Sequence, residues 1–324
     1  MKQIQWFPGH MQKARRQIEE KLSIIDIVYE LIDARIPESS KNPLLAEIIK
    51  NKPILMVLNK SDLADDVKTK EWIDKYESMG LNCISVNSLT EKILPKILKK
   101  TKEILKPLVE KEKERGMTKR AFKAMVIGIP NVGKSQFINN IAGKTKVKTG
   151  NKPGVTKIQS YIKTGGDLLL LDNPGVLWPK FENEKVGFNL ALLGSIKDDI
   201  LPLDEVAIYG VNFLIEKYPN YLFNRYRIEN AESLTPIEIM DAIGNVRGCK
   251  ISGGEIDYDR VINLFLYDLR NQKLGKLTLE TVNDVELWKS FMEQRYQIHR
   301  WSWWSRKRTS SRASSSRCCN TWSK

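Results

Sequence analysis

The stretch GIPNVGKS at residues 128–135 has the residue types that bind phosphate groups. Gly128 and Gly133 allow the backbone to curl so that its N–H groups face phosphate oxygens. Lys134 can reach the β- and γ-phosphates of a nucleoside triphosphate, and the Ser135 hydroxyl can coordinate Mg²⁺. An apolar segment precedes the stretch and a helical pattern follows it, as a phosphate loop requires. A Gly-rich turn between a strand and a helix is the alternative. The other predicted members of this loop are Asn131, Val132 and Gln136.

Two further segments could complete the phosphate chemistry. DNPG at residues 172–175 fits the pattern D-x-x-G, in which Asp172 would hold Mg²⁺ and the Gly175 N–H would contact the γ-phosphate. Thr156, in the sequence PGVT between the two motifs, is placed to close on Mg²⁺ and the γ-phosphate as a catalytic switch residue. The alternatives are an ordinary turn with an Asp-x-x-Gly sequence and a loop threonine that caps a turn.

NKSD at residues 59–62 could read the base of the nucleotide. The Asp62 carboxylate can accept from guanine N1–H and from the N2 amino group, whereas adenine offers neither donor. Asn59 can bond the other edge of the base and connect to the phosphate loop, and the Lys60 stem can cover the ring. Asn87 and Ser88 form a small polar loop that could offer a backbone N–H to guanine O6. These residues favour GTP and GDP and disfavour a plain ATPase.

The elements that must position these motifs alternate between strands and helices. Short apolar runs predict strands at residues 26–35, 53–60, 81–88, 122–128, 157–164 and 167–175. Helical patterns occupy residues 13–24, 43–50, 67–80 and 135–143, and a long basic helix or linker occupies residues 91–115. This alternation predicts an α/β fold with a mostly parallel sheet and helices on both faces, like that of P-loop NTPases. Each motif then follows the carboxyl end of a strand, where open α/β sheets bind ligands.

The motifs occur in an unusual order. Both base-reading segments precede the phosphate loop, and the switch and the Mg²⁺ segment follow it. Such an order is a rotation of the usual one, which a sheet tolerates if the old ends are joined and new ends are opened. We expect the basic stretch near residues 95–120 to be the join. The sequence therefore predicts a circularly permuted nucleotide-binding domain over residues 1–182.

The sequence pattern changes after this domain. Four helical patterns at residues 187–196, 204–218, 235–244 and 258–270 predict a small all-α domain over residues 183–290. The last part, residues 291–324, combines Trp, Ser and Arg without a helical or strand period. We interpret it as a disordered tail or as a cloning or reading-frame artefact, although a basic arm with stacking aromatic residues is the alternative.

Composition limits the class of protein. The chain has 53 Lys and Arg against 39 Asp and Glu, and a net charge of +14, which suits a polyanionic partner such as RNA. A solvated lysine-rich surface is the alternative interpretation. The four cysteines form no paired C-x-x-C pattern, no apolar run approaches about 18 residues, and the first residues do not resemble a signal peptide. We therefore expect a cytoplasmic protein that does not enter membranes.

These motifs together resemble the circularly permuted GTPases, and within them the ribosome biogenesis GTPase A family. The resemblance covers about residues 3–282 and rests on these segments: IQWFPGHM, DIVYELIDARIP, NKSD, GIPNVGKS, TGNKPGVT, DNPGVLWPKF and RGCKISGGEIDYDR. It implies an assembly factor that binds the precursor of the large ribosomal subunit and its rRNA late in maturation. It also implies GTP hydrolysis that is stimulated by that particle, a helical domain that binds RNA, and a free protein that is monomeric.

The resemblance also assigns roles in hydrolysis. Val176 is the apolar residue at the position where Ras-like GTPases orient water with a glutamine, so intrinsic hydrolysis should be slow. His10, in WFPGHM, matches the histidine to which the family's catalytic role is assigned, and a neutral imidazole can orient water. A structural histidine in an aromatic arm is the alternative. Asn131 matches the asparagine that accompanies activation by K⁺.

Two residues depart from the family pattern. Gln136 replaces the Thr or Ser that contacts the α-phosphate, and Asn173 replaces the usual Thr of DTPG. Gln136 and Val176 leave open a protein of another class, an rRNA-binding assembly scaffold with a vestigial nucleotide site. A permuted GTPase of the small subunit is a further alternative, but such proteins carry an OB-fold or a zinc module, and the sequence indicates neither.

Overall fold

The computed structural model describes residues 9–49, 51–117, 120–143, 160–164, 167–172, 177 and 183–283, without the side chains of residues 9–14, 17, 160 and 161. Met1–Glu280 form one compact unit, and Thr281–Lys324 form a second. The predicted boundary between residues 182 and 183 lies within the first unit and stays a prediction. The predicted tail at residues 291–324 lies outside the described residues.

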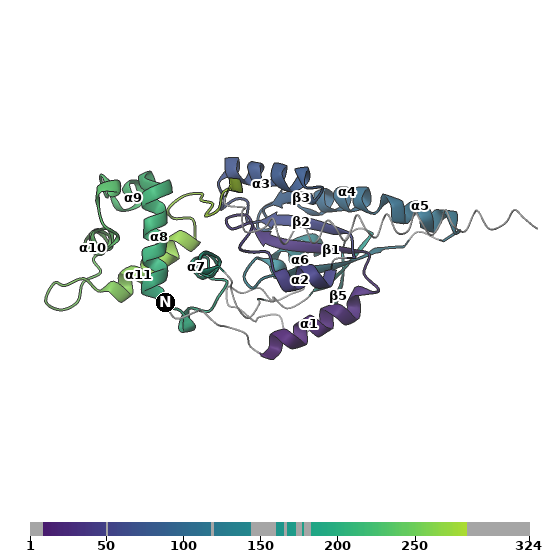
Figure 1. Ribbon diagram of the computed structural model, residues 1–324, viewed down its shortest axis with the longest axis horizontal. Coiled ribbons are helices and arrows are strands. Elements are labelled where there is room, and N and C mark those ends of the chain that lie inside the picture. Colours follow the sequence, from purple (N-terminus) through teal and green to yellow (C-terminus); the bar gives the residue numbers. More distant parts are fainter. Residues whose placement is uncertain are drawn as a thin grey trace, which may run out of the picture. The chain divides into compact units, whose positions relative to one another are not determined.

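A six-stranded sheet forms the centre of the nucleotide-binding half (Figure 1). Its strands are β1 (Ile27–Asp33), β2 (Ile54–Asn59), β3 (Asn82–Val86), β4 (Phe122–Gly128), β5 (Ser160–Lys163) and β6 (Leu168–Asp172). The strand order is β3-β2-β1-β4-β6-β5. All neighbours pair in parallel except β5 and β6, which pair in antiparallel orientation. The predicted mostly parallel α/β fold is confirmed.

Apolar runs explain why the central strands form. Every residue of β1 is buried, as are all but one residue of β2 and of β4, because helices cover both faces of a parallel sheet. Register pairs the last residue of β1 with the last residue of β2, so Asp33 lies opposite Asn59. The polar ends of adjacent strands therefore meet at one edge of the sheet.

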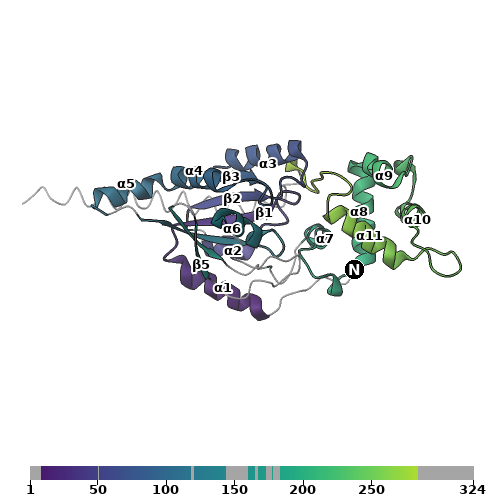
Figure 2. The same ribbon diagram turned by 180° about the vertical axis from the view of Figure 1, so that it is seen from behind.

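Helices cover the sheet on both faces. They are α1 (Gly9–Leu22), α2 (Pro43–Ile49), α3 (Asp66–Ser78), α4 (Leu94–Ile104), α5 (Lys106–Glu114) and α6 (Lys134–Ala142). Helix α3 packs beside β3, α4 against β2, and α6 against β4 and β6. Figure 1 shows α2 in front of the sheet, and Figure 2, from behind, shows α6 in front of it. Helix α1 begins at Gly9, four residues before the predicted start, since a glycine is a weak sequence signal for a helix start.

The basic stretch between β3 and β4 forms two helices. Helix α4 ends at Ile104, the N–H of the following residue, Leu105, still bonds to the Thr101 carbonyl, and α5 has Pro107 in its first turn. Proline has no N–H to continue the ladder and restricts the residue before it, so the helix is interrupted here. The predicted helix or linker at residues 91–115 is therefore a broken helix.

The second half is helical, as predicted. It contains α7 (Glu184–Leu192), α8 (Leu203–Lys217), α9 (Pro219–Tyr226), α10 (Pro236–Arg247) and α11 (Tyr258–Arg270), with short 3₁₀ turns at Asp198–Ile200 and Ala231–Ser233. Helix α9 is absent from the sequence prediction, although Pro219 at its start is a typical first helical residue. Within the part of the chain that the structure describes, no helix has both the length and the apolar character to cross a membrane.

Candidate nucleotide-binding site

The predicted site lies where the parallel strands end. Strands β1, β2, β4 and β6 end at Asp33, Asn59, Gly128 and Asp172, all on the carboxyl edge of the sheet. This is the edge at which open α/β sheets bind ligands, at the point where the connections leave in opposite directions. Asn87 and Ser88 follow the end of β3 at the same edge.

The phosphate loop has the backbone conformation that its glycines predict. Gly128 has a φ of 154°, and a Cβ there would lie 2.6 Å from the Leu31 carbonyl oxygen of the neighbouring strand. Asn131 and Gly133 have φ values of 57° and 94°, and α6 begins at the next residue, Lys134. A left-handed turn that leads into a helix N-terminus presents backbone N–H groups to an anion. Ser135 and Gln136 lie in the first turn of that helix and are partly buried.

Lys134 is buried within this loop. Its ammonium donates to the carbonyls of Gly128, at 3.2 Å, and Ile129, at 2.8 Å. Burial lowers the pKa of Lys134 to about 8, against the attraction of the Asp172 carboxylate. Asp172 is itself 1% exposed at the end of β6. The cation and the carboxylate that the motifs predict are therefore brought together in one buried site.

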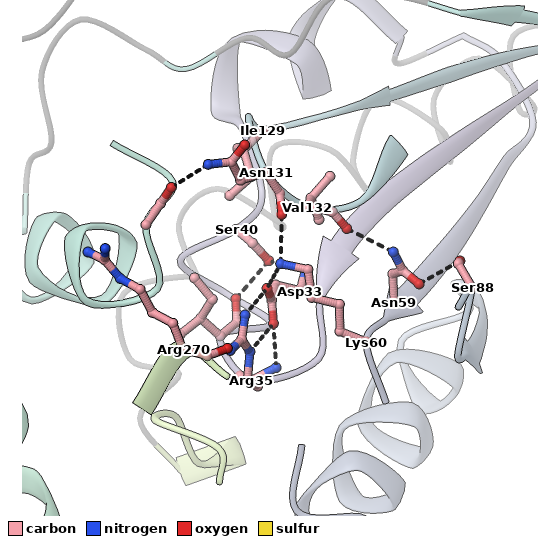
Figure 3. Close-up of polar contacts among 12 residues, drawn as sticks. Asp33, Arg35, Ser40, Asn59, Lys60, Ser88, Ile129, Asn131, Val132 and Arg270 are labelled. Carbon is pink, nitrogen blue, oxygen red and sulfur yellow. Dashed lines mark hydrogen bonds and ion pairs between the residues drawn. The ribbon is translucent and has the colours of Figure 1, made fainter. Parts of the chain in front are cut away.

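The base-reading loop, residues 59–63, is bonded directly to the phosphate loop (Figure 3). The Asn59 amide donates to the Val132 carbonyl at 2.8 Å and accepts from the Ser88 hydroxyl at 2.6 Å. The Lys60 ammonium donates to the Asn131 carbonyl at 2.6 Å. The two bonds to the phosphate loop connect residues about 70 positions apart and the bond to Ser88 connects residues 29 apart, so the three predicted segments form one structure. The predicted connection from Asn59 to the phosphate loop is present.

Asp33 and Arg35 belong to this site and were not among the predicted residues. The guanidinium of Arg35 forms two hydrogen bonds of 2.9 Å to the two Asp33 oxygens, and Lys60 donates to Asp33 Oδ2 at 2.9 Å (Figure 3). Burial raises the pKa of the Asp33 carboxyl, but the charges of Arg35 and Lys60 outweigh it and hold this pKa well below its ordinary value. Burial also lowers the pKa of Lys60, which Asp33 opposes. The signal in the sequence was the polar group Asp33-Ala34-Arg35 at a strand end.

The remaining predicted residues of the base site lie in the loops that follow β2 and β3. Asp62 is half-buried, and its backbone carbonyl accepts from the Gln272 side chain at 2.7 Å. The Asn87 amide donates to the Thr90 hydroxyl at 2.7 Å, while its oxygen accepts from the Leu89 N–H within its own loop. The loop after β3 is thus fixed by local bonds.

Several predicted residues lie outside the described part of the chain. Thr156, Gly175, Val176 and Asn173 are among them, and so is the side chain of His10, whose backbone is in the first turn of α1. The side chain of Asn131 is described: its amide donates to the Gly194 carbonyl, after α7, at 2.6 Å. One predicted phosphate-loop residue therefore contacts the helical half of the chain.

Several known proteins are similar to this chain in sequence or in fold. The model of a family described as "50S ribosome-binding GTPase" matches residues 123–214. Among solved structures, that of GDP-bound YlqF from Thermotoga maritima has a TM-score of 0.58 and 24% identity, over 83% of this chain and 100% of that chain. This likeness concerns the fold and confirms the predicted permuted GTPase architecture.

Curated relatives carry the assignment further. Ribosome biogenesis GTPase A of Bacillus pumilus is 51% identical over 277 residues, which are 86% of this chain and 98% of the relative. The relative of that name from Bacillus cereus is 50% identical over 291 residues, which cover 87% and 98% of the two chains. The resemblance that the motifs indicated is confirmed, and the chain belongs to the ribosome biogenesis GTPase A family.

Proposed function

We propose that this protein hydrolyses GTP as an assembly factor that binds the immature large ribosomal subunit late in its maturation. Alone it hydrolyses GTP slowly, and the particle stimulates the reaction. The observation that carries the proposal is the pair of hydrogen bonds that join the base-reading loop to the phosphate loop, Asn59 to Val132 and Lys60 to Asn131. A nucleotide held by both loops must offer phosphates at one end and a matching base at the other, because the loops form one preorganised site.

The positions of the described side chains support the predicted nucleotide-binding roles. Asp62 accepts from guanine N1–H and the N2 amino group, and Asn59 and the Lys60 stem complete the contacts with the base. The loop with Asn87 and Ser88 faces guanine O6. The backbone N–H groups of residues 131–136 and the ammonium of Lys134 bind the phosphates, to which Gly175 contributes from the D-x-x-G motif.

Magnesium fits the oxygen donors at the end of β6 and the start of α6. The Ser135 hydroxyl, the Asp172 carboxylate and Thr156 would hold Mg²⁺, which prefers oxygen ligands and keeps several waters. When bound, the ion neutralises charge on the β- and γ-phosphates. Lys134 stays cationic near neutral pH, since the pKa of about 8 leaves most of it protonated, and it can exchange its two carbonyl partners for phosphate oxygens.

His10 orients the attacking water, because Val176 cannot do so. A neutral imidazole can accept from water without carrying a charge toward the phosphates. Asn131 is the candidate ligand for K⁺, which would supply positive charge where other GTPases use an arginine. The slow reaction of the free protein follows if the particle is needed to bring His10 into place.

The helical half, residues 183–290, would contact rRNA. The basic balance of the chain supports a polyanionic partner, and the names of its relatives support a role in ribosome biogenesis. We expect the free protein to be a monomer in the cytoplasm.

The test is GTP hydrolysis measured with and without purified large ribosomal subunits, in K⁺ and in Na⁺ buffer. Three proteins are compared: the native chain, His10→Ala, and His299→Ala as the matched loss of an imidazole outside the GTPase motifs. We expect stimulation by the particle that is lost in His10→Ala and kept in His299→Ala. Stimulation that survives His10→Ala would reject the catalytic role. Tight binding of large subunits with no measurable GTP binding would favour the scaffold with a vestigial nucleotide site.

A further inference from the structure

The segment that follows α11 runs back along the base-reading loop. We call residues 271–280 the C-terminal strap; in Figures 1 and 2 it is the yellow-green segment that leads from α11 toward α3. Its second half is buried, with exposed fractions of 1% for Leu277, 0% for Thr278, 2% for Leu279 and 5% for Glu280. A chain terminus or linker that served only as a tether would be solvated instead.

Two bonds connect the strap with the base-reading loop itself. The Gln272 side-chain amide donates to the Asp62 carbonyl at 2.7 Å, and the Leu277 N–H donates to the Leu63 carbonyl at 3.1 Å. Asp62 is the residue whose carboxylate would read guanine. The strap therefore holds the backbone of the base-reading residue and of the residue that follows it.

The strap also bonds to two residues outside the base-reading loop, Asp65 and Arg35. The Thr278 hydroxyl accepts from the N–H of Asp65, the N-cap residue of α3, at 3.1 Å. The Leu279 N–H donates to the Arg35 carbonyl at 2.8 Å, next to the ion pair that holds Lys60. The strap thus reaches the two chain segments that border the base-reading loop.

The backbone of Gln272 indicates that its position is imposed. Its φ is 59°, in the left-handed region that residues other than glycine rarely adopt. A residue persists in such a conformation only when its surroundings determine it. Here the conformation brings the amide of Gln272 to the Asp62 carbonyl, which glycine could not do.

We propose that the C-terminal strap is part of the guanine site, with Gln272 as a positioning residue for Asp62, so that recognition of guanine and seating of the strap favour each other. The inference rests on the proposed function, because it assigns Asp62 to the base. Coupling of this kind is reciprocal. If the seated strap increases the affinity for guanine, bound guanine stabilises the seated strap by the same free energy. Since the strap continues α11, the nucleotide base would be linked to the helical half without passing through the γ-phosphate.

The first test compares GDP with inosine diphosphate, which lacks the exocyclic N2 amino group that Asp62 reads. The variant is Gln272→Gly, which removes the side chain while relieving the left-handed strain, so it should fold at least as well. The control is Asn263→Ala on α11, outside the strap, which also removes a side-chain amide that donates to a main-chain carbonyl, that of Asp259 at 2.8 Å. We expect the preference for GDP over inosine diphosphate to fall about fivefold in Gln272→Gly, the size of one neutral hydrogen bond, and to stay unchanged in Asn263→Ala.

A merely structural role for Gln272 would weaken the binding of both nucleotides equally and would leave this ratio unchanged. The second test is hydrogen exchange of peptides that span residues 271–280, with and without GDP. We expect GDP to slow the exchange of the Leu277 and Leu279 amides in the native protein, and less so in Gln272→Gly. An unchanged ratio overturns the inference, and so does unchanged exchange. If the native chain shows no preference for GDP over ADP, the proposed function fails first and the inference fails with it.

Discussion

Substitution of Gly133 by alanine should damage the base-reading loop from within the phosphate loop. A Cβ on Gly133 would lie 2.4 Å from Asn59 Nδ2, so the Asn59 amide must move. Asn59 is 1% exposed, and its side-chain amide is bonded to the Val132 carbonyl at 2.8 Å and to the Ser88 hydroxyl at 2.6 Å. We expect both bonds to break together, because Nδ2 and Oδ1 of Asn59 belong to one rigid amide group and move together.

The expected loss can be worked out from two contributions. Gly133 has a φ of 94°, and a left-handed conformation costs an alanine roughly 1–2 kcal/mol. Each broken hydrogen bond of Asn59 contributes about 1 kcal/mol. Gly143→Ala is the matched control, because Gly143 ends the same helix with a φ of 68° and nothing lies within 4 Å of its Cβ. The control carries the strain alone, so the two variants should differ by about 2 kcal/mol.

Urea unfolding without nucleotide gives both free energies of unfolding, and titration with GDP and ADP gives the preference for guanine. We expect Gly133→Ala to lose stability beyond the control and to prefer GDP less strongly, since Asn59 no longer holds the base loop. Gly143→Ala should keep the native preference. Losses that agree within about 0.5 kcal/mol, together with an unchanged preference in Gly133→Ala, would refute the reasoning.

Three further variants test buried polar contacts by urea unfolding. Burial raises the pKa of Glu280 from 4.5 to about 7, so between these pH values the folded chain binds more protons than the unfolded chain. The free energy of unfolding should therefore fall as the pH rises from 4.5 to about 7. The fall should be smaller in Glu280→Gln. Asp268→Ala removes the 2.7 Å ion pair with Arg225 and should cost about 2–3 kcal/mol, which a much smaller loss would contradict. Thr101→Val leaves the fully buried Tyr29 hydroxyl without its 2.8 Å partner and should cost about 1–3 kcal/mol; an unchanged midpoint would show that the hydroxyl finds another acceptor.

The sequence predicted the sheet and its motifs well for physical reasons. Buried parallel strands are continuous apolar runs, and the polar residue that ends each run marks the ligand edge. Asn59, Lys134 and Asp172 could therefore be assigned to the site by residue type and spacing. Boundaries were less certain where a weak residue starts an element, as at Gly9 of α1, and where a short helix such as α9 has too few residues to show a period.

The position of Asp33 in the site could have been predicted if the order of the strands in the sheet had been known. Its side chain ends β1, and β1 lies beside β2 in the sheet, so its carboxylate had to come close to Asn59 and Lys60 once the two strands were taken as parallel neighbours. The ion pair with Lys60 follows from that adjacency and from the need to compensate a buried carboxylate. What was missing was the order of the strands, which the alternation of strands and helices alone does not determine.

Three contacts of the C-terminal strap could not have been predicted in this way, because they end on main-chain carbonyls. Gln272 donates to Asp62, and Leu277 and Leu279 donate to Leu63 and Arg35, always to an oxygen that every residue possesses. Such acceptors leave no trace in residue types, so neither spacing nor chemistry reveals them. The donor Gln272 is visible in the sequence, but its partner is 210 residues away and is fixed only by the fold. Residues that position a site by bonding to main-chain carbonyls can therefore be identified from a structure but not from a sequence alone.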